Sequence, residues 1–314
     1  MSVPSAHRTC RIGPQGQGRV SNGDPRGDQE IEWTHIVLGE DVPPEFAEEL
    51  ATSRHTFADL EAGHMRAGVL SRGGRISFMY MAILDRDTYV PVAFFREPAR
   101  LLTVARSPVA LLDELQDEWV EDPDDFGRNI GGITYTVLDA LTDAYFPVLD
   151  DMHNDIEEIE ERLFGKKAPL MSDILAMKRD LLVMRKQIAP LRDNVNLLVR
   201  LGFPIITEES KIAFTDLYNH LLRLNDSIDV GRDLLSGILD AQLGIVSNRL
   251  NEIMRTMTVI STTLMVGALV AGVYGMNFRF MPELAWPGGY AFALALMFSL
   301  MGLTVWLFRR RGYF

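Results

Sequence analysis

A short peptide near the C-terminus, Tyr274-Gly275-Met276-Asn277-Phe278, stands between two long apolar segments and carries residues that could handle a metal ion. Asn277 offers a neutral side-chain oxygen, and Gly275 allows a sharp backbone turn that would point main-chain carbonyls at a common axis. Magnesium prefers oxygen ligands and holds its water shell tightly. A ring of neutral oxygens could therefore hydrogen-bond to that shell and pass the hydrated ion. The alternative is an asparagine that only caps a helix.

Carboxylates at helical spacing form a second group of possible metal ligands. Asp139 and Asp143 are four residues apart and share a helix face, where like charges repel unless a cation lies between them. A plain solvated face is an equally good interpretation. His64, His153 and His220 stand apart from one another in the sequence, and we expect them to be structural. No phosphate loop, nucleophile elbow or Cys/His metal cluster occurs, so the sequence does not predict an enzyme.

The two apolar segments beside the short peptide predict membrane spans. Met257–Tyr274 and Tyr290–Phe308 contain no charged residue, and each is about long enough to cross a hydrocarbon core of ~30 Å at ~1.5 Å per residue. Arg309-Arg310-Arg311 follows the second segment, and Arg255 precedes the first. By the positive-inside rule, both termini are expected to be cytoplasmic in the inner (plasma) membrane. Two buried helices of a soluble protein are the alternative.

Charge and cysteine content narrow the possible partners and compartment. The net charge is −12, and seventeen acidic residues lie between Asp113 and Glu161 against a single base, Arg128. This excess argues against nucleic acid as a partner. The one cysteine, Cys10, rules out an intrachain disulfide and fits a reducing compartment. No apolar stretch at the N-terminus resembles a signal peptide.

The first third of the chain predicts a disordered tail followed by a small α/β region. Residues 1–30 are rich in Gly, Pro, Arg and Ser without periodicity, and Cys10 lies in this tail. Pro44–Leu60 has a helical pattern. Short turns separate the later strands, so we expect antiparallel pairing. The predicted strands are Glu32–Leu38, Arg75–Ile83, Tyr89–Arg96 and Leu101–Arg106.

From about Ile133 onward, the spacing of apolar residues predicts helices. Gly165 and Pro169 end the first helix, and Ser172–Leu201 forms a second. Glu209–Tyr274 contains no proline and predicts one nearly continuous helix, roughly 100 Å long at ~1.5 Å per residue. A helix of this length cannot bury itself within one small domain, so we expect a parallel bundle of identical subunits.

The predicted fold class is an α+β cytosolic domain followed by a long stalk helix and a two-span helical membrane hairpin, in a parallel oligomeric bundle. Membrane lipid and other copies of the chain are then its partners. The predicted segments are a tail (1–30), an α/β domain (31–130), an acidic and basic helical pair (131–203), the stalk (204–253), the first transmembrane helix (254–276), an outer loop (277–289), the second transmembrane helix (290–308) and a cytosolic tail (309–314).

The sequence around the first span resembles the CorA family of divalent-cation channels. The likeness rests on Ala271–Phe278 at the end of that span and on Met281-Pro282-Glu283-Leu284 after it. Further similar segments are Ser247-Asn248, Asn251-Glu252, Arg232–Asp240, Phe214–His220 and Leu138–Phe146. The resemblance covers about residues 31–314. It implies a homopentamer that moves magnesium, with cobalt or nickel as further ions, and whose selectivity filter is formed by Gly275, Met276 and Asn277.

The resemblance also assigns one face of the first span to a pore. Residues on this face recur every three or four positions, and Met254, Met257 and Met265 would be apolar constrictions that could gate by dewetting. Ordinary helix packing with small residues at the contacts is the alternative. The predicted pore-lining residues are Asn251, Met254, Met257, Thr258, Ser261, Met265, Ala268 and Gly272.

A regulatory metal site is a further implication of the resemblance. Asp216 on the stalk would bind magnesium between subunits, together with an aspartate of the α/β domain. Asp59 is the predicted partner, with Glu61 as the alternative, and Asp139 and Asp143 are further possible ligands. Bound metal would hold the subunits together and close the pore, and loss of the ion would open it, which is negative feedback.

Three departures from the family pattern keep other functions open. Arg279 stands where an acidic residue is common and would place positive charge at the outer mouth. Ala268 and Val266 replace a common hydroxyl residue and a common proline. One alternative is a relative of the zinc-transporting branch, although Met281-Pro282-Glu283-Leu284 favours magnesium. Another is a membrane adaptor or sensor that does not conduct, which Arg279 favours.

Overall fold

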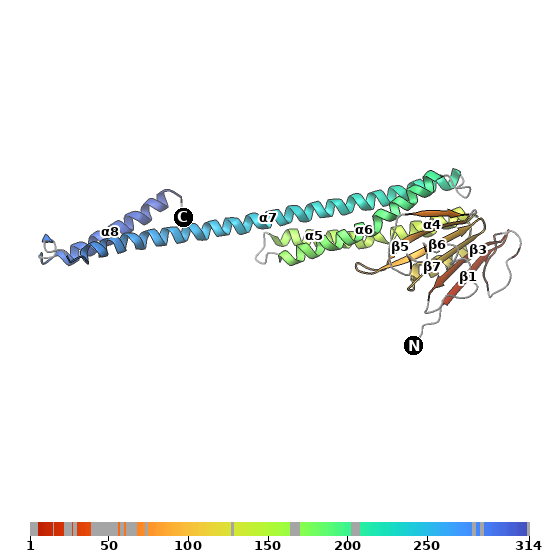
Figure 1. Cartoon of the computed structure of the whole chain (residues 1–314), viewed down its shortest axis with the longest axis horizontal. Coiled ribbons are helices and arrows are strands. Elements are labelled where there is room, and N and C mark those ends of the chain that lie inside the picture. The colour runs from red at the N-terminus through yellow and green to blue at the C-terminus, as the bar shows by residue number, and fades with distance from the viewer. Residues whose placement is uncertain are drawn as a thin grey trace. The chain divides into compact units, whose positions relative to one another are not determined.

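The computed structural model describes residues 6–14, 16–21, 27, 30–38, 56, 60, 68–72, 75–126, 129–163, 170–201, 208–277, 281–282 and 286–312. They belong to two compact units, Met1–Gly237 and Ile238–Phe314 (Figure 1). The strands are β1 (Ala6–Ile12), β2 (Gly18–Ser21), β3 (Ile31–Val37), β4 (Val69–Arg72), β5 (Arg75–Ile83), β6 (Tyr89–Glu97) and β7 (Arg100–Ala105). The helices are α3 (Ala110–Glu121), α4 (Ile130–Asp143), α5 (Tyr145–Leu163), α6 (Met171–Leu201), α7 (Glu208–Tyr274) and α8 (Gly289–Arg310).

The first unit contains a mixed sheet. Its strand order is β2-β1-β3-β7-β6-β5-β4, and all neighbours are antiparallel except β3 and β7, which are parallel. The predicted antiparallel pairing of the three closely spaced strands β5, β6 and β7 is therefore confirmed. The parallel pair joins this meander to an N-terminal hairpin that the sequence did not predict.

Both faces of the sheet are buried, and successive residues of each strand point to opposite faces. On one face, Trp33 of β3 packs against Trp119 of α3, with ring centroids 6.0 Å apart. The other face carries an apolar cluster that includes Leu60 from outside the sheet. This cluster consists of Ile36, Leu60, Met79, Ala93, Phe95, Leu102 and Val104. Burial on both faces explains why these strands read as nearly continuous apolar runs.

The structure corrects the prediction that residues 1–30 are a disordered tail. β1 pairs with β3 over its whole length, from Ala6 opposite Val37 to Ile12 opposite Ile31. Cys10 is fully buried there, and burial raises the pKa of its thiol to about 11. The polar composition was misleading because tertiary partners satisfy the polar side chains, as the Arg11–Glu32 pair at 2.7 Å shows. The sheet also starts before residue 31, earlier than predicted.

The helical half agrees with the prediction except at one interruption. The helix expected from about Ile133 ends at Asp143, and α5 begins at Tyr145. Pro147 explains the break, because a proline lacks the amide proton for an interior helical hydrogen bond but fits the first turn of a new helix. Helix α6 and the single long helix α7 start within one residue of the predicted positions. Of the predicted helix Pro44–Leu60, only Thr56 and Leu60 are among the described residues, and both are helical.

The second unit holds the two apolar segments. Among the residues that the structure describes, two helices are long and apolar enough to cross a membrane, by length and composition alone. They are Ser210–Tyr274, with a mean hydropathy of 1.8 in its apolar part, and Gly289–Arg310, with 2.1. Within this unit, α8 packs beside α7 at Gly267, where an added Cβ would lie 3.0 Å from the sulfur of Met301.

Candidate functional site

Four side chains from two helices of the first unit form a cluster, called here the α4–α7 cluster. Asp139 and Asp143 come from α4, and Asp216 and His220 come from α7. Each pair is four residues apart, so each pair projects from one face of its helix. Asp139, Asp143 and His220 each offer a ligand atom, and these three atoms lie within 4.8 Å of one another.

His220 is central to the α4–α7 cluster. Its Nδ1 lies 3.3 Å from Oδ1 of Asp139 and 3.7 Å from Oδ1 of Asp143, and its Nε2 lies 3.5 Å from Oδ2 of Asp216. These are ion-pair distances without hydrogen-bond geometry. Nδ1 of His220 and Oδ1 of Asp139 are buried and make no hydrogen bond to any group that the structure describes. Nδ1 of His220 and Oδ1 of Asp139 are thus two possible metal-ligand atoms that face each other without a hydrogen bond.

Burial and charge make the α4–α7 cluster favourable for a cation. Burial, with the nearby Asp143 carboxylate, raises the pKa of Asp139 above its ordinary value. Tyr135 donates a hydrogen bond to Oδ2 of Asp139 at 3.3 Å. Asp143 and Asp216 are more than half exposed, so solvent and ions can reach the cluster. A divalent cation would offset the repulsion among the three carboxylates.

Aromatic contacts hold the ligand-bearing turns of α4 and α7 in place. Phe146 meets the His220 ring edge-on, with centroids 6.4 Å apart. Six residues earlier on α7, Phe214 packs edge-on against Tyr135 of α4, with ring centroids 6.1 Å apart. These contacts fix which turn of α7 faces Asp139, so that the His220 ring reaches both carboxylates of α4.

The structure corrects one prediction about the histidines, and it does not describe the predicted partners of Asp216. The expectation that His220 is isolated was wrong, because Asp139 and Asp143 of α4 lie 3.3 and 3.7 Å from its ring. That it has a structural role stays a prediction. His153 does have a structural partner, since its Nε2 lies 3.2 Å from the backbone oxygen of Ser227. Asp59, Glu61 and His64 lie outside the described residues. The predicted pairing of Asp216 with Asp59 between subunits therefore stays a prediction.

The predicted pore-lining face of α7 is exposed in the single chain. Asn251, Met254, Met257, Thr258, Ser261, Met265, Ala268 and Gly272 all have exposed side chains or Cα positions. Val259 and Gly267 are buried, and at 100° per residue they lie on the opposite side of the helix. The second unit thus packs α8 against one face of α7 and leaves the other bare, including Met265 at 68% exposure.

The predicted selectivity residues continue directly from the last turn of α7. The amide of Gly275 donates to the carbonyl of Ala271 at 2.9 Å, and that of Met276 donates to Val273 at 3.3 Å. Gly275 does not have a positive φ; among the described glycines only Gly16 and Gly312 do. A Cβ at Gly275 would lie 3.1 Å from the oxygen of Ala271, so close backbone approach explains the glycine better than the sharp turn expected from sequence. Asn277 is exposed.

Comparison with known proteins identifies the class. The sequence model of the family described as CorA-like Mg²⁺ transporter protein matches residues 77–310. The chain belongs to this family, which confirms the resemblance inferred from its motifs.

Individual relatives agree with this assignment. YfjQ of Bacillus subtilis (strain 168) is 33% identical over 255 residues, which are 80% of each chain. The cobalt/magnesium transport protein CorA of Thermotoga maritima is 37% identical over 182 residues, covering 58% of this chain and 52% of that one. The matched segment is thus about half of the Thermotoga protein.

The fold is that of a solved family member. The complete structure of the CorA magnesium transporter from Methanocaldococcus jannaschii superimposes with a TM-score of 0.83 at 24% identity and covers 100% of both chains. This likeness confirms the predicted fold class for one chain: an α/β domain, a long helix and two apolar C-terminal helices. This comparison of single chains gives no information on the number of subunits.

Proposed function

We propose that this protein is a magnesium channel in which several parallel copies of α7 surround a pore for hydrated divalent cations. The observation that carries the proposal is the bare polar and methionine face of α7, opposite the face that packs near α8. Asn251 lies just before the predicted span, and Thr258 and Ser261 lie within it on the same exposed face of α7. Polar residues inside a membrane span usually face protein or water rather than lipid. A ring of identical subunits, five by the family resemblance, would turn this face toward a common axis.

The Asn277 side chains would form the selectivity ring at the outer end of this pore. Their neutral oxygens suit the hydration shell of Mg²⁺, whose dehydration is unfavourable. Gly275 and Met276 would shape the ring, with cobalt and nickel as further ions of suitable size. Arg309, Arg310 and Arg311 would hold the end of α8 at the cytoplasmic membrane surface, with both termini on that side.

Magnesium uptake by reconstituted vesicles tests the channel. Asn277→Ala should abolish most of the uptake, because it removes the amide oxygens that would contact the hydrated ion. Thr304→Ala is a matched control, since Thr304 is a polar residue of α8 whose hydroxyl only bonds to the backbone of Leu300 at 2.8 Å. Equal uptake by wild type and Asn277→Ala would reject the selectivity ring.

The α4–α7 cluster is the proposed sensor for negative feedback. A divalent cation held by Asp139, Asp143, Asp216 and His220 would fix α4 against the stalk and stabilise the closed channel, and its loss would release the stalk. Uptake by wild-type vesicles should therefore fall when magnesium is raised on the cytoplasmic side. Asp139→Asn combined with Asp143→Asn should remove this dependence and leave uptake at low magnesium intact.

An adaptor or sensor that does not conduct remains the second candidate because of Arg279. Several arginines at the outer mouth would repel cations, most strongly at low ionic strength. Absence of wild-type uptake at both low and high cytoplasmic-side magnesium would favour this candidate. Higher uptake by the Arg279→Glu variant than by wild type would instead support a channel whose conduction rate is limited by Arg279.

A further inference from the structure

The end of α8 combines an aromatic residue with three consecutive arginines. Arg310 lies over the ring of Trp306, with its guanidinium carbon 5.4 Å from the ring centroid. The two residues are four apart and therefore share one face of the helix. Gly312 has a positive φ of 75°, and its amide donates to the carbonyl of Arg309 at 3.2 Å. The helix thus ends in a left-handed turn directly after the arginines, at the boundary of the apolar segment.

Trp306 and Arg310 lie on the side of α8 that faces away from α7. Met301 marks the packed side, because its sulfur lies 3.0 Å from the position of a Cβ added to Gly267 of α7. At 100° per residue, Trp306 and Arg310 are turned about 140° and 180° from Met301 around the helix axis. Trp306 is 52% exposed, and Arg310 is exposed as well. In a ring of subunits whose pore is built from α7, this side of α8 would meet lipid.

The positive charge at this end of α8 is not balanced by neighbouring acids. None of the carboxylates that the structure describes forms an ion pair with Arg309, Arg310 or Arg311. From Leu284 to Phe314 the sequence contains no Asp or Glu, although the whole chain has a net charge of −12. Three guanidinium groups are therefore concentrated where an apolar span ends, and no described carboxylate engages them.

A phospholipid fits this arrangement better than a soluble anion does. An indole ring prefers the membrane interface, where its body contacts hydrocarbon and its N–H meets water. An arginine that stacks on such a ring keeps its N–H groups at headgroup depth, where they can pair with a lipid phosphate. Leu303, one turn before Trp306 and 50% exposed, supplies an apolar surface for an acyl chain. A soluble anion would use only the arginines.

We propose that Trp306 and Arg310, with Arg309 and Arg311, form a site for an anionic phospholipid such as phosphatidylglycerol. Net negative charge distinguishes this lipid from phosphatidylcholine, whose phosphate is balanced by a cationic choline. Each arginine near an anionic membrane surface adds to the attraction, and salt screens it. The site binds lipid at α8, so its test does not depend on the proposed channel activity.

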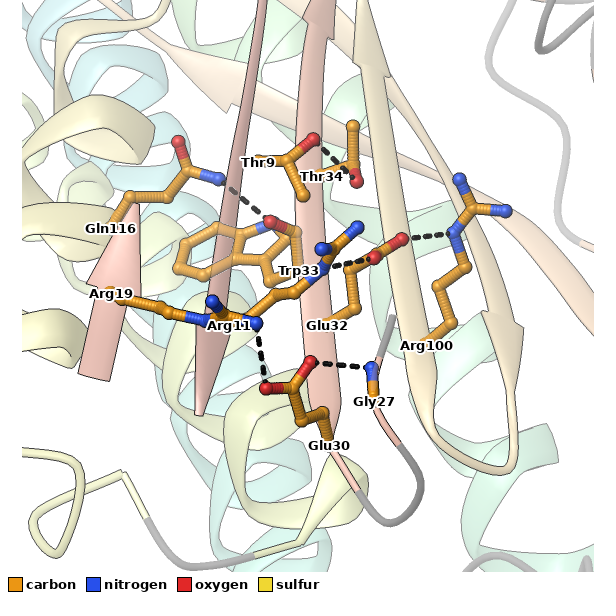
Figure 2. Close-up of polar contacts among 10 residues, drawn as sticks. All are labelled: Thr9, Arg11, Arg19, Gly27, Glu30, Glu32, Trp33, Thr34, Arg100 and Gln116. Atoms are coloured by element: carbon orange, nitrogen blue, oxygen red, sulfur yellow. Dashed lines mark hydrogen bonds and ion pairs between the residues drawn. The ribbon is translucent and has the colours of Figure 1, made fainter. Parts of the chain in front are cut away.

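Quenching of tryptophan fluorescence by brominated phospholipids tests the site, because bromine atoms on the acyl chains quench only tryptophans that contact lipid. The full-length Trp286→Phe protein, reconstituted in bilayers, reports on Trp306. Trp33 and Trp119 add a constant background, because both are fully buried between the sheet and α3, where Gln116 donates to the backbone oxygen of Trp33 at 3.3 Å (Figure 2). The lipid preference is the affinity for brominated phosphatidylglycerol divided by that for brominated phosphatidylcholine.

We expect a lipid preference at Trp306 of at least about tenfold at low salt, and a smaller one at high salt. Arg310→Gln should lower this preference at least about threefold, because it removes the charged hydrogen-bond donors beside the ring. Arg249→Gln is the matched control. It removes the same charge from an exposed position of α7 in the same unit, before the apolar span, and should leave the preference unchanged.

The Trp306→Phe protein reports instead on Trp286, which is 57% exposed and lies just before α8. No Lys or Arg occurs between Phe280 and Phe308, so the lipid preference at Trp286 should be close to one. A preference close to one at Trp306, equal preferences at the two tryptophans, or equal losses from Arg310→Gln and Arg249→Gln would overturn the proposal. Circular dichroism of each variant shows that it is folded.

Discussion

The α4–α7 cluster and the bare face of α7 lie on the same helix but differ in what a single chain supplies. In the cluster, one chain brings three carboxylates and an imidazole to within ion-pair distance. On the bare face, one chain supplies a stripe of exposed polar residues and methionines, and no described residue packs against it. The proposed ion site therefore lies within one subunit, whereas the proposed pore requires further copies. The two proposed functions of α7 should accordingly respond to different substitutions.

The largest expected effect comes from filling the bare face at Gly272. An added Cβ at Gly272 meets nothing within 4 Å in one chain, and the same holds for Gly302 on α8. Gly272→Leu should reduce magnesium uptake about tenfold or more, because each copy would push a side chain into the proposed pore. Gly302→Leu should change uptake less than about twofold, because α8 does not line the proposed pore. The two variants are comparable because both substitutions raise helix propensity by a similar amount, about 1 kcal/mol.

The comparison of these two glycine variants separates a pore from ordinary helix packing. Equal loss of uptake in both would show that the bare face has no special role. Measurement of subunit number by native mass spectrometry is the control, because Gly272→Leu could also disrupt assembly. An assembled but inactive Gly272→Leu protein supports the pore.

A smaller effect is expected from removing the imidazole of the α4–α7 cluster. Imidazole nitrogen favours cobalt, nickel and zinc over magnesium, which prefers oxygen ligands. His220→Ala should therefore weaken cobalt binding by about 10–100-fold and magnesium binding by less than about threefold. Competition against the absorption spectrum of bound cobalt measures both affinities.

His153→Ala is the control for that measurement. His153 contacts the backbone of Ser227 on the same long helix, but no carboxylate of the α4–α7 cluster. It should leave the ratio of cobalt to magnesium affinity unchanged. A His220→Ala protein that binds both ions as wild type does would remove the imidazole from the proposed ligand set.

The difference between local patterns and tertiary contacts also explains which parts of the fold the sequence could predict. The bounds of α7 and α8 were predicted almost to the residue because helical and hydrophobic patterns are local properties of the chain. Strands β5, β6 and β7 were predicted for the same reason, since they are apolar runs between clear turns. β1 and β2 were missed because their polar side chains are satisfied only in the folded sheet, as Arg11 is by Glu32.

The candidate site, too, could be predicted only where its residues are close together in the sequence. Asp139 and Asp143 could be paired from sequence because they lie four residues apart on one helix. The family resemblance added Asp216, but His220 was read as isolated because its acidic partners on α4 come from a different part of the chain. The spacing of Asp216 and His220, also four residues, was a usable signal. Only tertiary packing shows that this second pair faces the first.

The smallest expected effect concerns the stability of the metal-free α4–α7 cluster. Asp139→Asn in EDTA at pH 7 should raise the melting temperature by about 1–3 °C. Burial and Asp143 raise the pKa of Asp139, so the ionised carboxylate is less favourable in the folded state than in the unfolded chain. This destabilisation is present above the raised pKa and disappears below about pH 3.9, where both states are protonated. The difference between the two proteins should therefore vanish in acid.

Added metal should reverse the order of stability, because a ligand that binds only the folded state stabilises it by RT ln(1 + [L]/Kd), about 2.7 kcal/mol at a hundredfold excess over Kd. Wild type, with its charged ligand intact, should gain more than Asp139→Asn from saturating magnesium or cobalt. Asp151→Asn, exposed on α5, should show neither the gain in EDTA nor the reversal. If Asp139→Asn stays more stable at saturating metal, Asp139 is not a ligand, and its buried charge needs another explanation.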